Sequence, residues 1–383
     1  MPQPRAVPIR TVHVDLDGRS YDIEIGGGLL AKAGGRLTGL FGDRLLVPVV
    51  DAAVADTHLP KLTKSLSAAG IRSTDPIIVP AGEASKGWEG FVRVVEGLLD
   101  RGVDRQAAVL ALGGGVIGDL AGYAAASTMR GLDFVQLPTT LLAQVDSAVG
   151  GKTGINTRHG KNLVGAFHQP RHVLIDTDTL ATLPHREMRA GYAEIIKYGL
   201  LGDAAFFAWL EQHGQAVLDR EPTALTEAIA RSCAAKAAIV AADEREAGQR
   251  ALLNLGHTFA HALEAEAGYD GSLLHGEAVS IGLALAFRLS AALGYCDGAV
   301  IDQVEAHLER QDLPVLPITG NWRRGLSTDR LLTHMRLDKK AEAGRLTFIL
   351  ARGIGDSFVS RDVDEASVRP VLDEFLARIA AAA

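Results

Sequence analysis

The sequence has few cysteines, few aromatic residues and no long uninterrupted apolar run. Its two cysteines, Cys233 and Cys296, form no C-x-x-C pair, which argues against a disulfide framework or a thiolate zinc site and favours a reducing, cytoplasmic setting. The first ten residues, MPQPRAVPIR, lack the apolar core of a secretory signal. The longest apolar stretch, residues 278–296, contains Arg288, so we expect a buried helix there and no membrane span.

The chain also lacks an excess of basic residues. Its 39 Lys and Arg are outnumbered by 46 Asp and Glu, and the net charge is -7. Such a charge supplies no field that would attract nucleic acid or an anionic membrane. Hydrophobic residues make up 47% of the 383 residues, which is enough for a core, and at ~150 residues per domain the length predicts two domains.

The N-terminal half has the pattern of an α/β fold. Apolar alternation on both sides of Asp17-Gly18 predicts a hairpin with a type I′ turn. Further on, a helical pattern over residues 88–99 closes at Gly102. Short apolar runs alternate with such helical segments and lie at residues 45–50, 77–79, 107–112, 134–137 and 173–175. Together they predict a parallel sheet with crossover helices.

After about residue 183, strand patterns nearly disappear and alanine-rich helical patterns dominate. We expect helices at residues 186–201, 204–218, 225–242, 251–267 and 277–293. The one late strand pattern is at residues 346–350. We therefore predict an α/β domain over 1–180 and a mostly α-helical domain over 181–383, with a ligand cleft between them.

A glycine-rich turn follows the fourth strand-like run. Gly113, Gly115 and Gly118 satisfy G-x-G-x-x-G between the run at 107–112 and a helical segment, the context of a dinucleotide site. A plain tight turn explains the same glycines about as well. Asp51 follows the run at 45–50 and is either a ribose contact or a helix N-cap.

Histidines and a carboxylate gather in the helical half. Glu194 lies on one helical segment, His257 and His261 are four residues apart on another, and His275 opens a third. Two imidazoles and a carboxylate form the usual three-ligand catalytic zinc set. The spacing leaves open whether His257 pairs with His261 or with His275.

Several cationic side chains occur in glycine-rich or apolar surroundings, where a solvated surface cation is unusual. They are Arg130, Lys152, Lys161, Lys197, Lys236, Arg250, Lys339 and Lys340. In an acidic protein, this set indicates a site for a small polyanion such as a sugar phosphate with a carboxylate.

Seven ordered sequence blocks resemble 3-dehydroquinate synthases of the shikimate pathway. The blocks are GGGVIGDLAGYAAASTMRG (113–131), LPTTLLAQVDSAVGGKTGIN (137–156), GKNLVGAFHQP (160–170), GYAEIIKYGLL (191–201), DEREAGQRALLNLGHTFAHALE (243–264), LLHGEAV (273–279) and DKK (338–340). The segment Glu83-Ala84-Ser85-Lys86 differs from the commoner family pattern only in its second residue and keeps both charges.

The resemblance implies a sugar phosphate cyclase with a Rossmann-like α/β N-terminal domain, which has a parallel sheet, and a mostly α-helical C-terminal domain. It also implies the use of NAD and a divalent metal, usually zinc with cobalt as an alternative. The family's metal ligands match Glu194, His257 and His275, which makes His261 an acid/base residue. The implied catalytic residues are His261, Glu246, Lys152, Lys197, Arg250 and Asn254.

The implied cofactor contacts are Asp51, Glu83, Lys86, Gly114, Gly115, Val116, Asp119, Thr139, Thr140, Lys161 and Thr182. The implied substrate contacts are Arg130, Asp146, Lys152, Asn162, Lys197, Lys236, Arg250, Asn254 and one lysine of the Lys339/Lys340 pair. Arg130 matches an arginine that reaches the substrate of the neighbouring subunit, so the resemblance also implies a homodimer.

The implied reaction converts 3-deoxy-D-arabino-heptulosonate 7-phosphate to 3-dehydroquinate and phosphate. It proceeds by transient oxidation with NAD, phosphate elimination, re-reduction and intramolecular aldol closure. Two other enzyme classes remain alternatives: a related cyclase acting on sedoheptulose 7-phosphate, and a metal-dependent oxidoreductase like glycerol dehydrogenase. A non-catalytic descendant is disfavoured, because every matched metal and acid/base residue is present.

Overall fold

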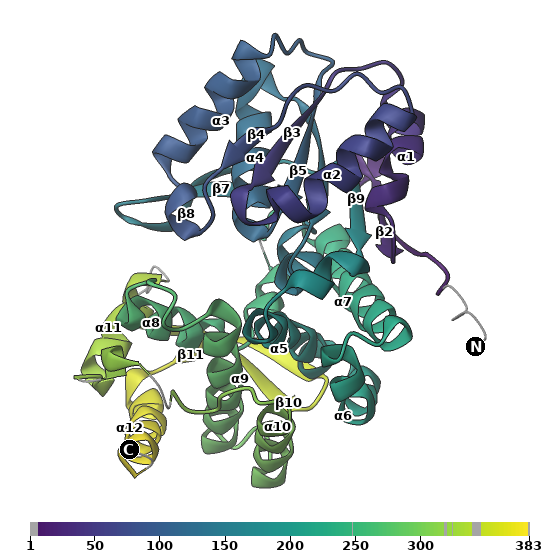
Figure 1. Ribbon diagram of the computed structural model, residues 1–383. Coiled ribbons are helices and arrows are strands. Elements are labelled where there is room, and N and C mark those ends of the chain that lie inside the picture. Colours follow the sequence, from purple (N-terminus) through teal and green to yellow (C-terminus); the bar gives the residue numbers. More distant parts are fainter. Residues whose placement is uncertain (1–6, 247, 318–319, 324, 339–345, 382–383) are drawn as a thin grey trace. The chain divides into compact units, whose positions relative to one another are not determined.

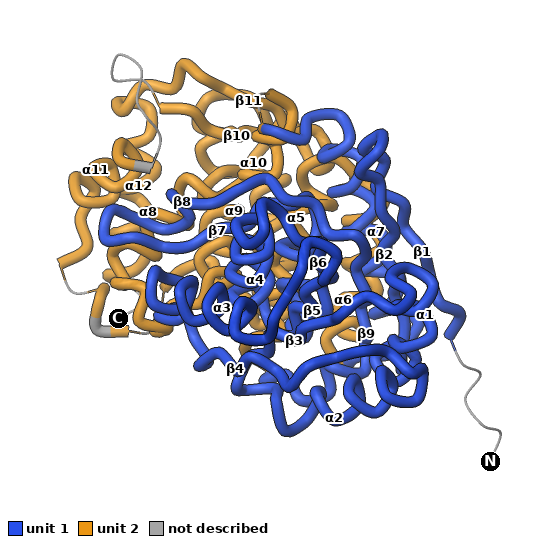
Figure 2. The backbone as a smooth tube through the Cα atoms, turned by 90° about the horizontal axis from the view of Figure 1, so that it is seen from above, with its two compact units in different colours: residues 1–184, 220–245 blue, residues 185–219, 246–383 orange. Residues whose placement is uncertain are grey.

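The computed structural model describes residues 7–246, 248–317, 320–323, 325–338 and 346–381 (Figure 1). The chain forms two compact units (Figure 2). The first unit comprises Met1–Pro184 and Arg220–Arg245, and the second comprises His185–Asp219 and Glu246–Ala383. A single cut near residue 180 would place 220–245 in the second unit, whereas the structure groups this segment with the first.

A seven-stranded sheet forms the centre of the first unit, in the order β1-β2-β9-β6-β5-β3-β4. β1 pairs with β2 in the antiparallel sense, and every other neighbouring pair is parallel. The strands are β1 (Arg10–Val14), β2 (Tyr21–Gly26), β3 (Leu46–Asp51), β4 (Ile77–Val79), β5 (Ala108–Gly113), β6 (Asp133–Pro138) and β9 (His172–Asp176). The five short apolar runs are therefore confirmed as strands.

Both faces of this sheet are covered by helices, which explains why its strands are apolar at consecutive positions. In β3, Val47 and Val49 belong to one core cluster, and Leu46 and Val50 belong to the other. Figure 1 shows α3 and α1 on opposite sides of the sheet. The helices of this unit are α1 (Ala33–Phe41), α2 (Ala52–Ala68), α3 (Trp88–Asp100), α4 (Gly115–Ser127) and α7 (Pro222–Ala242).

The predicted type I′ turn is wrong, although the hairpin itself is present. Val14 pairs with Tyr21, so the connection is a six-residue loop that contains a 3-10 turn, Asp17–Arg19. A type I′ turn needs two central residues with positive φ, and only Asp17, at 53°, has one here. The Ser20 hydroxyl accepts a hydrogen bond from the Leu16 amide at 2.8 Å and closes the loop.

The second unit is mostly helical, as expected. Its elements are α5 (His185–Gly202), α6 (Ala204–Leu218), α8 (His257–Ala267), α9 (His275–Ala292), α10 (Gly298–Arg310), α11 (Thr328–Asp338), α12 (Glu365–Ala381) and a hairpin of β10 (Leu346–Gly353) and β11 (Asp356–Val363). Helix α9 packs against α5, α8, α10 and α12. Among the described helices, none combines the length and the apolar character needed to cross a membrane.

The expected single helix over 251–267 is interrupted. Residues Gln249–Asn254 form a 3-10 helix, and α8 begins only at His257. Gly256 between them is left-handed, with φ 79°. Asn254 and His257 therefore do not share one continuous helix, and the side-chain directions expected from that helix do not apply.

Candidate functional site

Three potential metal ligands meet in the second unit. Glu194 lies on α5, and His257 and His275 are the first residues of α8 and α9. One ligand atom of each lies within 4.8 Å of those of the other two. The Nε2 atoms of His257 and His275 lie 3.6 and 3.4 Å from Glu194 Oε1.

The two imidazoles are oriented through their other ring nitrogens. His257 Nδ1 lies 3.2 Å from the Leu255 carbonyl oxygen, and His275 Nδ1 lies 3.2 Å from Glu264 Oε2. These oxygens only accept hydrogen bonds, so each Nδ1 donates and each Nε2 can offer its lone pair. One carboxylate oxygen and two imidazole nitrogens facing one point fit a zinc or cobalt ion with an open position.

The neighbouring charges, not burial, separate the pKa values of the two histidines. Burial, with help from the Lys197 ammonium, lowers the pKa of His257 to about 3 despite Glu194. Burial also lowers the pKa of His275, but the Glu264 and Glu194 carboxylates outweigh it and raise this pKa to about 10. A metal ion that binds His275 must therefore displace a proton.

One cationic group, Lys197, contacts a potential ligand, and further cationic and amide groups belong to the same unit. Lys197 is one helical turn after Glu194, and its Nζ lies 2.5 Å from Glu194 Oε2; the two side chains are 1% and 0% exposed. Arg250 is buried. Asn254 Nδ2 donates to Glu246 Oε1 at 3.2 Å. These groups could hold an anionic substrate, whereas the predicted contacts Lys339 and Lys340 lie outside the described residues.

His261 lies beside the cluster and is not part of the ligand set. Its ring centroid is 5.5 Å from that of His257 and 6.4 Å from that of His275. The group that could hold a metal among the described residues consists of Glu194, His257 and His275. His261 is thus within reach of a ligand bound at the cluster, as an acid/base residue requires.

In the first unit, predicted cofactor residues lie at the carboxyl edge of the parallel sheet. β3 ends at Asp51, β5 ends at Gly113, and Thr139 and Thr140 follow β6. The chain passes from β3 outward to β4 and then back across β3 to β5. Ligands of open α/β sheets bind at such a reversal of strand order.

The glycine-rich turn leaves little room for side chains. A Cβ at Gly114 would lie 3.1 Å from Thr140 Cγ2, and one at Gly115 would lie 2.8 Å from Ser147 Oγ. Gly114 caps α4, which contains Val116 and Asp119 in its first two turns. The amides at this N-terminus are suited to a pyrophosphate. The Asp51 carboxylate accepts a hydrogen bond from Ala53 N at 2.9 Å, so Asp51 is also the N-cap of α2.

A charged network lies beside this turn. Lys86 Nζ is 2.5 Å from Asp119 Oδ2, and Lys161 Nζ is 3.8 Å from Glu83 Oε1. Burial raises the pKa of Asp119, and the Lys86 ammonium opposes that rise. Thr182 lies elsewhere in this unit, with its hydroxyl 3.0 Å from His58 Nε2.

Asn156 joins the cofactor residues to a predicted substrate residue. Its Nδ2 donates to Glu83 Oε1 at 2.7 Å, and its Oδ1 accepts from the Asn162 amide at 3.0 Å. Its own amide donates to the Lys86 carbonyl at 2.7 Å. The sequence analysis did not predict a role for Asn156, although this residue ends the block KTGIN and lies shortly before the block GKN.

The remaining predicted substrate residues of the first unit lie on several elements. Lys152 and Asn162 are on the hairpin of β7 (Lys152–Thr157) and β8 (Gly160–Phe167), Lys236 is on α7, and Arg130 and Asp146 are in short helical turns. Lys236 is buried and donates to Asp146 Oδ1 at 2.8 Å. Lys152 and Asn162 are exposed. Arg130 is exposed and left-handed, with φ 67°.

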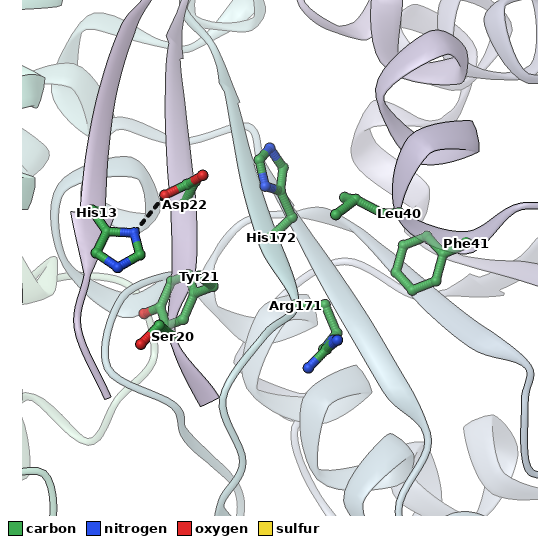
Figure 3. A pocket seen from close by; sticks show the side chains of 8 residues that line it. All are labelled: His13, Ser20, Tyr21, Asp22, Leu40, Phe41, Arg171 and His172. Carbon is green, nitrogen blue, oxygen red and sulfur yellow. Dashed lines mark hydrogen bonds and ion pairs between the residues drawn. The ribbon is translucent and has the colours of Figure 1, made fainter. Parts of the chain in front are cut away.

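A separate hollow of about 190 Å³ also lies in the first unit (Figure 3). It is lined by His13, Ser20, Tyr21, Asp22, Leu40, Phe41, Arg171 and His172. None of these is a predicted site residue. His13 and Asp22 bind each other, at 2.7 Å.

Comparison with known proteins identifies the family. Residues 76–190 match the family described as 3-dehydroquinate synthase N-terminal, and residues 191–341 match 3-dehydroquinate synthase C-terminal. A 3-dehydroquinate synthase of Caulobacter vibrioides is 55% identical over 96% of this chain and 99% of its own. The chain belongs to the 3-dehydroquinate synthase family. One from Ruegeria pomeroyi is 53% identical, also over 96% of this chain and 99% of its own.

Solved structures of other cyclases share this family's fold. A 2-epi-5-epi-valiolone synthase from Streptomyces hygroscopicus, solved with NAD+ and Zn2+ bound, matches with a TM-score of 0.85 and 32% identity over 95% of this chain and 99% of its own. A 2-deoxy-scyllo-inosose synthase matches with a TM-score of 0.86 and 23% identity over 95% of this chain and 100% of its own. The α/β and helical fold class is thereby confirmed.

Proposed function

We propose that this protein is a 3-dehydroquinate synthase, which converts 3-deoxy-D-arabino-heptulosonate 7-phosphate to 3-dehydroquinate and phosphate. The observation that carries this proposal is the 55% identity to a relative of that name across 96% of the chain. The predicted lysines, arginine and acid/base histidine are all present. As an enzyme, it is a phosphate-eliminating carbon-oxygen lyase.

The proposed cofactors are NAD and a divalent metal, zinc or cobalt. When bound, NAD supplies a hydride acceptor that is regenerated within the cycle, and the metal supplies a Lewis acid for the substrate hydroxyls. Glu194, His257 and His275 would hold the metal. The proposed NAD contacts are Asp51, Glu83, Lys86, Gly114, Gly115, Val116, Asp119, Thr139, Thr140, Lys161 and Thr182. We assign the nucleotide to an N-terminal domain, residues 1–180, and the metal to a helical domain, residues 181–383.

The charged and polar side chains bind and orient the sugar phosphate. The Arg250 guanidinium offers two parallel N–H donors to the substrate carboxylate. Lys152, Lys197 and Lys236 supply ammonium groups for the phosphate and the hydroxyls, and Asp146, Asn162 and Asn254 supply hydrogen bonds. One lysine of the Lys339/Lys340 pair completes the set.

Proton transfer is assigned to the groups beside the metal ligands. His261 carries an imidazole that takes and returns protons without ligating the metal. Glu246 accepts a hydrogen bond from Asn254 and so holds that amide in place. Elimination of phosphate next to the transient ketone needs such a base, because the C6 proton must leave.

We further propose a cytoplasmic homodimer in which Arg130 reaches the substrate of the other subunit. Two free cysteines agree with a reducing compartment. Arg130 is left-handed and exposed, and its side chain makes no hydrogen bond within the described part of the chain, which leaves it available to a neighbouring subunit. Nucleic acid and membranes are not proposed as partners, since the net charge is -7.

Two rival activities follow from the structural relatives. A sister cyclase, such as one acting on sedoheptulose 7-phosphate, is favoured only by the 32% identity to the valiolone synthase. A metal-dependent dehydrogenase is favoured only by fold, since a probable glycerol dehydrogenase matches with a TM-score of 0.57 at 18% identity. Neither rival explains the carboxylate-binding arginine and the several buried lysines together.

A coupled assay separates the three activities. Supplied with NAD and zinc, the protein should release phosphate from the heptulosonate phosphate without net NADH. Because sedoheptulose 7-phosphate carries no carboxylate for Arg250, its kcat/KM should be at least about 100-fold lower, or ~2.7 kcal/mol. Equal efficiency on both sugars would favour the sister cyclase, and NADH accumulating with turnover would favour the dehydrogenase.

A further inference from the structure

A buried carboxylate contacts one potential metal ligand from outside the ligand set. Glu264 lies on α8, one helical turn after His261. Its side chain is 6% exposed, and its Oε2 lies 3.2 Å from His275 Nδ1. None of the site residues predicted from the sequence is Glu264.

This contact determines which nitrogen of His275 can bind a metal. A carboxylate only accepts, so the hydrogen bond to Glu264 requires a proton on Nδ1. The lone pair of neutral His275 is then on Nε2, the atom that lies 3.4 Å from Glu194 Oε1. A ligating histidine commonly donates its second N–H to such an acceptor, which fixes the ring and increases its basicity.

The ring of the other histidine, His257, is oriented by a backbone group and not by a side chain. His257 Nδ1 faces the Leu255 carbonyl oxygen at 3.2 Å, a backbone acceptor that no substitution at Leu255 removes. The orientation of His275 therefore depends on a replaceable group, whereas that of His257 does not.

The backbone of His275 is fixed separately from its ring. Glu277 Oε2 accepts from the Leu274 amide at 2.9 Å, at the start of α9. Arg186 binds both Glu277 oxygens, at 2.6 and 2.7 Å, and the Ser272 carbonyl at 2.9 Å. A change at Glu264 is thus expected to free the ring without moving the helix start.

We propose that Glu264 is a positioning residue of the metal site: its carboxylate holds His275 with Nδ1 protonated, so that Nε2 binds the metal. The proposal rests on the proposed metal ligands and adds a residue that sets their affinity. In this proposal, Glu264 acts on the metal through His275 and is not itself a ligand.

The decisive variant is Glu264→Gln, which keeps the size of the side chain but replaces the charged acceptor of the Nδ1 proton by a weaker neutral amide oxygen. The matched control is Glu266→Gln on the same helix. Glu266 is 1% exposed and pairs with Arg330 and His334, each at 2.8 Å. Both variants remove a buried, paired carboxylate from α8, but only Glu264 contacts a potential metal ligand.

The measurement is the zinc dissociation constant of the full chain, obtained by competition with a chromogenic chelator. We expect E264Q to weaken zinc binding by about 10- to 100-fold and E266Q to stay within about threefold of wild type. An E264Q value equal to that of wild type or of E266Q would overturn the proposal. If wild type itself bound no stoichiometric zinc, the proposed metal site would fail first, which is a distinguishable result.

A second measurement applies if E264Q does not fold. In the zinc-loaded wild-type protein with 15N-labelled histidine, the His275 ring should keep its Nδ1 proton, with Nε2 bound to the metal. Metal bound at Nδ1 would overturn the proposal without any variant at Glu264.

Discussion

Gly256 and Gly282 bring the backbones of α8 and α9 into direct contact. A Cβ at Gly282 would lie 2.2 Å from the Gly256 carbonyl oxygen, and one at Gly256 would lie 2.8 Å from Leu283 N. Gly256 immediately precedes His257, and Gly282 is on the helix that His275 begins. The close packing of these two glycines therefore sets the separation of the two histidines.

Gly282→Ala should push α8 and α9 apart, because the clash is with backbone. We expect a loss of roughly 1–3 kcal/mol of unfolding free energy together with weaker zinc binding, measured by urea denaturation and metal titration. Gly298→Ala is the control, since a Cβ there meets nothing within 4 Å and should cost no stability. Equal unfolding free energies for the two variants would contradict the argument.

Single substitutions at the metal site should distinguish the metal ligands from the acid/base residue by their effect on metal content. His275→Ala or Glu194→Ala should lose most of the metal and the activity, because a three-ligand site has no spare ligand. His261→Ala should keep the metal and slow turnover. Metal analysis of the purified variants checks this, and metal loss in His261→Ala equal to that in His275→Ala would mean that the ligand pair is wrong.

The sequence predicted the strands of the central sheet better than the turns, hairpins and helix breaks that connect the elements. The strand runs at β3 and β5 were recognisable because alternate residues of each face different buried cores. The β7–β8 hairpin was missed, since its strands contain Gly154 and Gly165, which pack closely against the opposite strand's backbone, and many of its residues are exposed.

The spacing of the histidines alone could not decide whether His261 or His275 is the second histidine ligand of the metal. Both fit a pattern of two histidines and a carboxylate, and only the family resemblance separated them. The direction of each ring depends on the Leu255 carbonyl and on Glu264, and the break at Gly256 that turns α8 depends on a contact with distant α9. Such long-range contacts have no local sequence signal.

Asn156→Asp should affect the two ligands of the first unit unequally. The new carboxylate would face Glu83 Oε1, which Asn156 now contacts at 2.7 Å, but would still accept from the Asn162 amide. We expect the KM for NAD to rise about tenfold, or ~1.4 kcal/mol, with a smaller change for the sugar phosphate. Asn156→Ala removes the contacts to Glu83 and to the Asn162 amide and should raise the KM for NAD and the KM for the sugar phosphate. An unchanged KM for NAD in N156D would contradict this role.

His307 should make the second unit sensitive to acid. Burial lowers its pKa to about 4, and its Nε2 lies 3.3 Å from the Tyr192 hydroxyl. The unfolded chain takes up this proton below a pKa of about 6.5, whereas the folded chain does not until about 4, so stability is full above 6.5 and falls as the pH decreases between these values.

The loss attributable to His307 is about 3 kcal/mol over that interval. His307→Gln should therefore flatten the pH dependence of the urea midpoint between pH 7 and pH 4.5, measured on metal-free protein. Tyr192→Phe keeps the imidazole and should keep the wild-type slope. If the urea midpoint of His307→Gln depended on pH as steeply as that of wild type, His307 would not be the cause of the acid sensitivity.

The last prediction concerns Arg130 and the proposed dimer. Met129 and Arg130 are both left-handed, with φ 51° and 67°, a conformation that non-glycine residues adopt only when the surroundings enforce it. The side chain of Arg130 is exposed, so a neighbouring subunit can reach it. Arg130→Ala and Lys152→Ala should each be inactive alone. After subunit exchange, the mixed dimer has one site with Lys152 from one chain and Arg130 from the other, so an equal mixture should recover roughly a quarter of wild-type activity. If Arg130 acted within its own subunit, no mixed site would contain both groups, and verified mixed dimers would remain inactive.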